Sequence, residues 1–262
     1  MLEIKILQQL QTLQKVATGF EPKQLELIPK AQLTLAASYQ TTLFTRIELE
    51  NFYGIELDDF AHEVAILSLW LAQHQMNMKF KEAFGTGNPT LPLKEGGHIT
   101  HGNATRLDWE KVCPKKLGDE IYILGNPPYL GSRKQEEHQK DDLKYLFGSD
   151  YKSLDYIAAW FYKGGSFIKG TKSKCAFVTT NSICQGEQVS ITWPRILNEN
   201  VNIDFAYKDF KWSNNAKFNA GVTVLIIGLA GLQQSKKYIY HENIRKEVGE
   251  INPYIVEGKI LY

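Results

Sequence analysis

Short apolar runs alternate along this chain with longer stretches in which hydrophobic residues recur at helical spacing. Helical spacing occurs in residues 2–17, about 30–45, 58–75 and 188–197, and after Ser153, which we expect to be an N-cap. The apolar runs predict buried strands at residues 52–57, 99–104, 121–124, 175–180, 201–206 and 222–229, with a further short strand at 238–240. This alternation predicts an α/β fold with a mostly parallel sheet and helices on both faces.

Three segments between these elements carry more specific expectations. The helix at residues 58–75 has an apolar stripe that should lie against the sheet, formed by Phe60, Val64, Leu67 and Leu71. Residues 80–97 are rich in Gly and Pro and predict a surface loop. Residues 131–150 are polar and charged, and a long loop at this place would be a lid or a substrate-contacting segment.

Composition limits the class of protein. The chain has 262 residues, of which 43% are hydrophobic and 23% charged, enough for one large domain or for a core with an appendage. No apolar run is long enough for a membrane span, and we expect no membrane association. Three cysteines without Cys-x-x-Cys spacing favour a reduced, cytoplasmic setting without structural zinc.

Charge gives no global signal for a nucleic-acid partner, because 30 basic residues face 29 acidic ones and the net charge is +1. Local clusters are more suggestive. Basic side chains could meet phosphates, or they could be ordinary solvated charge, at Arg133, Lys134, Lys140, Lys144, Lys208, Lys211 and Lys217.

The stretch Tyr122 to Tyr129 carries the clearest chemistry. An apolar strand ends at Gly125, and two prolines then stiffen a loop that presents Asn126 and Tyr129 at the carboxyl edge of the sheet. The Asn126 side-chain oxygen and the Pro127 carbonyl can accept hydrogen bonds from one exocyclic NH2 group, and the Tyr129 ring can stack on the base that carries it. The alternative is a strand-ending turn with an incidental asparagine.

Asn126-Pro127-Pro128-Tyr129 after an apolar strand resembles the catalytic motif of amino-group methyltransferases that use S-adenosylmethionine. These include adenine-N6 DNA methyltransferases and the glutamine methyltransferases of release factors. The neighbouring motifs closely resemble MmeI-like restriction–modification enzymes of types IIL and IIG, which are adenine-specific DNA methyltransferases. They occur in the right order over most of the chain, at residues 51–56, 74–77, 103–109 and 211–216 and at 222–224.

The resemblance implies a Rossmann-like class I methyltransferase core and assigns roles to particular residues. The resemblance assigns catalysis to Asn126, Pro127, Pro128 and Tyr129. A flipped adenine of double-stranded DNA would stack on Tyr129 and on a second ring from the polar loop after residue 210. The S-adenosyl-L-methionine site falls to Glu56, Leu57, Asn103, Ala104 and Asn126, with Glu56 on the ribose, and the second stacking ring is Trp212 or Phe218. No metal is implied for methyl transfer.

The resemblance also implies that parts are missing. The predicted strands correspond to the second to seventh strands of the family, and the first central strand with its Gly-rich cofactor turn has no counterpart. We therefore expect a catalytic core over residues 1–230, truncated at its N-terminal end. Residues 231–262 would be a linker toward a missing target-recognition domain. Another chain could supply the missing segments.

Three alternatives remain open from the sequence. A protein-glutamine N5-methyltransferase would share the Asn-Pro-Pro-Tyr motif but lack the Trp212 loop. A catalytically inactive fragment would keep only a structural or interaction role. Methylation of the chemically similar N4 amine of cytosine is a weaker possibility.

Overall fold

The computed structural model describes residues 49–84, 97–116, 118–197, 200–211, 223–232 and 236–259. The predicted helices at residues 2–17 and 30–45 lie outside these ranges. The chain divides into two compact units, one of residues 1–52 and 63–98 and the other of residues 53–62 and 99–262. No helix in the described ranges is both long and apolar enough to cross a bilayer.

The first unit contains η1 (Leu49–Asn51) and most of the long helix α4 (Asp59–Phe84). Gly97 fits tightly here at φ +81°, because a Cβ atom would meet the Leu69 side chain at 2.8 Å. The helix extends to Phe84, so the loop predicted from residue 80 was placed too early.

Helix α4 does not bury its predicted apolar stripe. The stripe that was expected to lie against the sheet is exposed, with Phe60 at 77% and Leu71 at 52%. The half-buried positions are instead on another side of the helix and include Ile66, Leu69 and Trp70. Because α4 is apolar on more than one side, helical periodicity alone could not identify its buried face.

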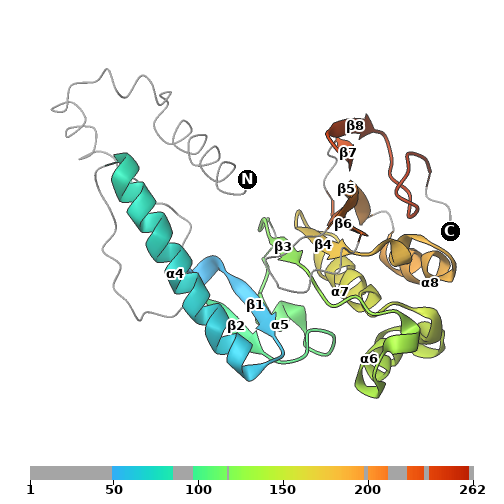
Figure 1. Cartoon of the computed structure of the whole chain (residues 1–262), viewed down its shortest axis with the longest axis horizontal. Helices are drawn as coiled ribbons and strands as arrows, with labels where there is room; N and C mark the ends of the chain where they lie inside the picture. The colour runs from blue at the N-terminus through green and yellow to red at the C-terminus, as the bar shows by residue number, and fades with distance from the viewer. Residues whose placement is uncertain are drawn as a thin grey trace. The chain divides into compact units, whose positions relative to one another are not determined.

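The second unit is built on a six-stranded sheet in the order β3–β4–β6–β5–β7–β8 (Figure 1). Its strands are β3 (Tyr122–Gly125), β4 (Lys174–Thr179), β5 (Asn202–Lys211), β6 (Thr223–Ala230), β7 (Lys237–His241) and β8 (Ile244–Val248). Strands β3 and β4 are parallel, as are β5 and β7, whereas β6 is antiparallel to both of its neighbours. The carboxyl ends of β3, β4, β5 and β7 therefore share one edge of the sheet.

Five strands of this sheet are present near their predicted positions: β3, β4, β5, β6 and β7. Strand β5 continues to Lys211, five residues beyond its predicted end, and β8 was not predicted. Strands β7 and β8 belong to the sheet, so this part of the predicted linker is structured. The domain boundary at residue 230 stays a prediction.

The segment at residues 131–150 is not a long loop, which corrects the predicted lid. It contains η2 (Ser132–Lys134) and the helix α6 (Glu137–Phe147), which buries Leu143 and Phe147. Ser153 ends η3 (Gly148–Ser153) and is not an N-cap, because α7 (Ala158–Ile168) begins five residues later. Helix α8 (Glu187–Ile196) lies near its predicted position, but it continues through Pro194, where we expected an interruption.

Helices α7 and α8 pack against one face of the six-stranded sheet. Phe161 of α7 and Trp193 of α8 are fully buried, and Phe161 packs edge-on against Phe177 of β4 at 5.3 Å between ring centroids. The opposite face carries side chains that are only partly buried, such as Val178 of β4 and Tyr207 of β5. Tyr207 stacks there on Tyr240 of the neighbouring strand.

A separate two-stranded sheet joins β1 (Tyr53–Glu56) to β2 (His98–His101). In the ranges that the structure describes, no strand pairs with the outer edge of β3 or joins the two sheets. Leu124 and Tyr122, which lie on the same face of β3, are 79% and 60% exposed. In the described ranges, the strands that end at Glu56 and Gly125 therefore have no shared neighbouring strand, and the predicted absence of the first central strand from the chain stays a prediction.

Candidate active site

The Asn126–Tyr129 loop starts at the carboxyl end of β3, where Gly125 pairs with Phe177 of β4. Gly125 permits a close approach, since a Cβ atom there would lie 3.3 Å from the Phe177 ring. Pro127 is buried and Tyr129 packs against the main hydrophobic core, whereas Asn126 is exposed. The loop is thus held at Pro127 and Tyr129 and leaves the Asn126 amide open to a ligand.

The residue after this loop, Leu130, is hydrogen-bonded through both its N–H and its carbonyl group. Its N–H donates to Asp155 Oδ1 at 2.7 Å, and its carbonyl accepts from Gln135 Nε2 at 2.8 Å and from the Tyr156 N–H at 3.0 Å. Asp155 and Gln135 are buried. Neither was identified from the sequence, although a carboxylate inside the apolar run at residues 154–161 is the signal that could have revealed Asp155.

Glu56 lies at the end of β1, as predicted for a ribose-binding carboxylate. Its Oε1 accepts hydrogen bonds from the N–H groups of Leu57 (2.8 Å) and Asp58 (3.2 Å). These bonds fix the carboxylate at the strand end and leave Oε2 as an acceptor for a ligand. Asp58 Oδ1 accepts from the Ala61 N–H, so Asp58 fills the capping role at the start of α4.

Asn103 follows β2 and is held firmly by its neighbours. Its oxygen accepts from both the N–H and the hydroxyl of Thr105, at 2.9 and 2.7 Å, and its Nδ2 donates to Asp142 Oδ2 at 2.8 Å. The Ala104 carbonyl accepts from Trp109 Nε1 at 2.9 Å. An adenine amino group could reach the Asn103 oxygen only if the Thr105 hydroxyl rotated away, and this assignment stays a prediction.

Asp142 organises this region from α6. Its carboxylate accepts from Asn103, from Arg106 Nε at 2.6 Å and from the Tyr156 hydroxyl at 2.7 Å. Burial alone would raise the pKa of Asp142, but these hydrogen bonds outweigh it and hold the pKa below its ordinary value. The same burial and the Asp142 charge raise the pKa of Tyr156, which therefore stays a hydroxyl donor.

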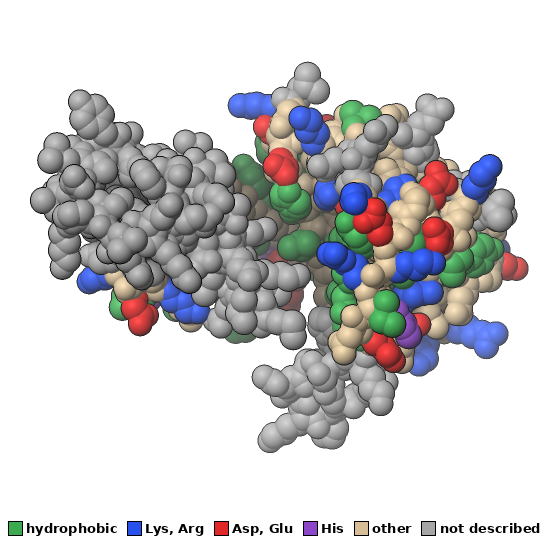
Figure 2. Space-filling model, turned by 90° about the horizontal axis from the view of Figure 1, so that it is seen from above, with side chains coloured by type: hydrophobic (Ala, Val, Ile, Leu, Met, Phe, Trp, Pro, Cys, Tyr) green, Lys and Arg blue, Asp and Glu red, His purple; other side chains and the backbone are tan. Residues whose placement is uncertain are grey.

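The two proposed stacking partners of Tyr129, Trp212 and Phe218, lie outside the described residues, as does Lys217. Arg133 and Lys134 are exposed in η2, just after the loop. On the face shown in Figure 2, Lys and Arg side chains are interspersed with Asp and Glu among the described residues. This mixture agrees with the near-zero net charge and gives no single-sign patch on that face.

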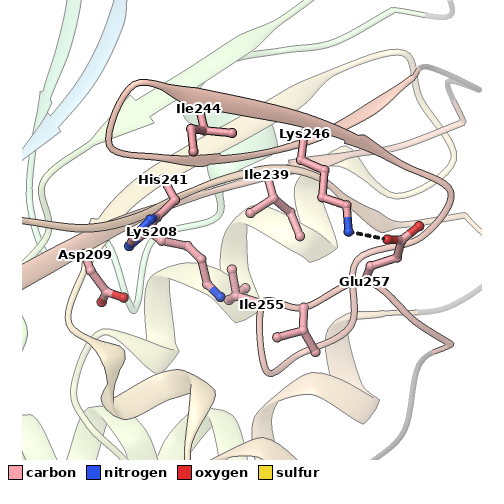
Figure 3. Close-up of a pocket in the computed structure, with 9 residues that line it drawn as sticks. Lys208, Asp209, Ile239, His241, Ile244, Lys246, Ile255 and Glu257 are labelled. Atoms are coloured by element: carbon pink, nitrogen blue, oxygen red, sulfur yellow. Dashed lines mark ion pairs between the residues drawn. The ribbon is translucent and has the colours of Figure 1, made fainter.

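A cavity of about 410 Å³ lies elsewhere at the carboxyl edge, beside β5, β7 and β8 (Figure 3). Two of the residues that line the cavity, Lys246 and Glu257, form an ion pair at 2.8 Å through Lys246 Nζ. The cavity is lined by Lys208, Asp209, Ile239, His241, Ile244, Lys246, Ile255, Val256 and Glu257. Of the residues singled out from the sequence, Lys208, one of the basic residues that could meet phosphates, lines it, whereas none of the predicted catalytic, cofactor-binding or base-stacking residues in the described ranges does.

Comparison with known proteins bears on what the loop does. The protein family described as MmeI, DNA-methyltransferase domain, matches residues 1–241. The chain belongs to this family. DNA methyltransferase A of Bacillus subtilis (strain 168) is 49% identical over 217 residues. The type IIL restriction-modification enzyme MmeI, whose structure was solved in complex with DNA, has 39% sequence identity with this chain, and the two structures superpose with a TM-score of 0.74.

These family members are much longer than this chain. The match to DNA methyltransferase A covers 81% of this chain but 25% of that protein, and the match to MmeI covers 83% of this chain and 30% of MmeI. The chain therefore spans between a quarter and a third of the length of these relatives. The family relationship agrees with a Rossmann-like methyltransferase core.

Proposed function

We propose that this chain is the catalytic core of a site-specific DNA methyltransferase in a restriction–modification system. It would transfer a methyl group from S-adenosylmethionine to the N6 amine of an adenine flipped out of duplex DNA. The observation that carries the proposal is the Asn126–Tyr129 loop at the carboxyl end of β3, in a chain of the MmeI methyltransferase family.

The loop suits attack by a planar, weakly nucleophilic amine. The exposed Asn126 amide oxygen and the Pro127 carbonyl each accept one hydrogen from the NH2 group. This directs the nitrogen lone pair toward the methyl donor, and the stabilisation grows as the transition state forms. The Tyr129 ring supplies a stacking surface for the extruded base.

The residues at the ends of β1 and β2 fit a nucleoside cofactor in part. The Glu56 carboxylate, fixed through Oε1, can accept from ribose hydroxyls with Oε2. The Asn103 amide is already engaged by Thr105 and Asp142, so it shapes the wall of the site more than it offers unused acceptors. The cofactor would supply the electrophilic methyl group.

The proposal is tested by incubating the complete protein and a radiolabelled methyl donor with duplex DNA or, separately, with a release factor. We expect label in DNA, and mass analysis of the nucleosides should give N6-methyladenine. Label in the release factor would support a glutamine methyltransferase, and N4-methylcytosine would change the target base. No transfer to either substrate would contradict the proposal and leave a structural or interaction role.

A further inference from the structure

In the part of the chain that the structure describes, the buried carboxylate of Asp155 forms no ion pair and accepts from three hydrogen-bond donors. It accepts from the Leu130 N–H at 2.7 Å, from the Ile157 N–H at 3.2 Å and from the Ser182 hydroxyl at 2.9 Å. Asp155 is only 4% exposed. Burying a carboxylate costs free energy, so we expect Asp155 to do more than lie at the start of α7.

Two of the three donors come from separate strand-end segments at the carboxyl edge, and the third, the Ile157 N–H, lies beside Asp155 at the start of α7. Leu130 follows the Asn126–Tyr129 loop of β3, and Ser182 lies in η4 (Asn181–Cys184), directly after β4. The Ser182 hydroxyl also bonds to Thr180 Oγ1 at 2.7 Å. Asp155 therefore ties the exit of the loop to the end of the neighbouring strand.

We propose that Asp155 is a positioning residue for methyl transfer, which holds Leu130 so that Tyr129 and Asn126 keep their places at the end of β3. Gln135 binds the other backbone group of the same residue, the Leu130 carbonyl. Its Nε2 donates to the carbonyls of Leu130 and Leu154, both at 2.8 Å. Pro127 and Pro128 remove two amide donors from the loop, so its fixation depends on the residues that follow it.

The role rests on the proposed function, but the fixation of Leu130 can be measured without it. Hydrogen exchange of the Leu130 amide reports directly on its bond to Asp155. We expect this amide to lose its protection in Asp155→Ala and to keep most of it in Asp155→Asn, because the asparagine oxygen can still accept from Leu130. Asp141→Ala, an exposed carboxylate on α6, is the matched control and should change nothing.

The catalytic readout is steady-state methylation of duplex DNA by the complete protein. Asp155→Ala should lower kcat by about 10²-fold, the effect of misplacing a reacting group by about 1 Å, with the KM for the methyl donor little changed. Asp155→Asn should restore most of kcat. Gln135→Met, which keeps the size of the side chain but removes its donors, should also lower kcat and so provides a second route if Asp155→Ala does not fold.

The outcomes separate the two proposals. An unchanged kcat in folded Asp155→Ala, or unchanged exchange at Leu130, would overturn the positioning role. A parallel loss of kcat and thermal stability in both Asp155 variants, without rescue by asparagine, would also overturn it and leave a purely structural carboxylate. If the wild-type protein transfers no methyl group to DNA but Leu130 exchange follows the expected order, the proposed function fails while the fixation of the loop stands.

Discussion

Asn126 offers the most direct test among the individual side chains. Its amide is exposed at the end of β3, and its proposed contact is with the substrate amine. Asn126→Ala should therefore lower methyl transfer by about 10²-fold or more and leave affinity for the methyl donor largely intact, as for loss of one oriented polar group in a catalytic site. Single-turnover kinetics and calorimetry measure the two quantities. Near-normal turnover would show that Asn126 is not catalytic.

Tyr129 should tolerate another aromatic ring far better than alanine. Base–aromatic stacking contributes roughly 1–3 kcal/mol per base, and it requires the ring but not the hydroxyl. Tyr129→Phe should stay close to wild type, whereas Tyr129→Ala should weaken capture of the flipped adenine. A mismatch at the target base should partly rescue the alanine variant, because extrusion then costs less. If Phe were as damaging as Ala, the hydroxyl would have a role of its own.

The site residues differ in how far sequence could assign them. Asn126 and Tyr129 could be located because an apolar strand followed by Asn-Pro-Pro-Tyr is a local pattern. Asp155 stands out only as a carboxylate in an apolar run, and the sequence does not show that Asp155 binds Leu130 or that Asp142 binds Arg106 and Asn103. These partners are 25, 36 and 39 residues away and are brought together only by the fold. The case of Asn103 shows a further limit, since the sequence does not reveal that Thr105 occupies its oxygen.

Helix α6 shows why one secondary element was missed. Its N-terminus has a capping box in which Glu136 and Gln139 bond each other's backbone, but Glu is an unusual N-cap and gave no recognised start signal. The segment is also mostly polar, because only one side packs, with Leu143 fully buried. By contrast, β3 and β4 were predicted near their limits, since short buried runs between breakers are strong local signals.

Because α6 carries Asp142, it should contribute a pH-dependent part of the stability. The folded-state pKa of Asp142 is lowered, so its stabilising effect is complete above the unfolded pKa of about 3.9 and is lost as pH falls through the folded value. The difference in unfolding free energy between wild type and Asp142→Asn should therefore shrink between pH 6 and pH 2. Urea titrations at several pH values measure it, and a constant difference would refute this account.

The arrangement of the two sheets bears on the whole chain. Strands β1 and β3 carry Glu56 and Asn126 at their ends, yet they belong to different sheets, and Leu124 and Tyr122 of β3 are exposed. From the family resemblance, the strand that would join them has no counterpart among the predicted strands, and this absence stays a prediction because residues 1–48 lie outside the described ranges. Hydrophobic periodicity alone gave the individual strands but could not give their order, which depends on contacts distant in sequence.

We expect residues 1–262 on their own to bind S-adenosylmethionine weakly or not at all, and not to methylate DNA. Glu56 can serve the ribose, but a Gly-rich turn with a helix N-terminus would be needed for the methionine end, and side chains elsewhere cannot replace its backbone donors. Among the described residues the outer edge of β3 is unpaired, and such an edge favours pairing with another strand. Calorimetric titration of this chain with S-adenosylmethionine tests the expectation. Adding a segment that supplies a strand and a Gly-rich turn in trans should restore binding, whereas micromolar affinity of the chain alone would show that the site is already complete.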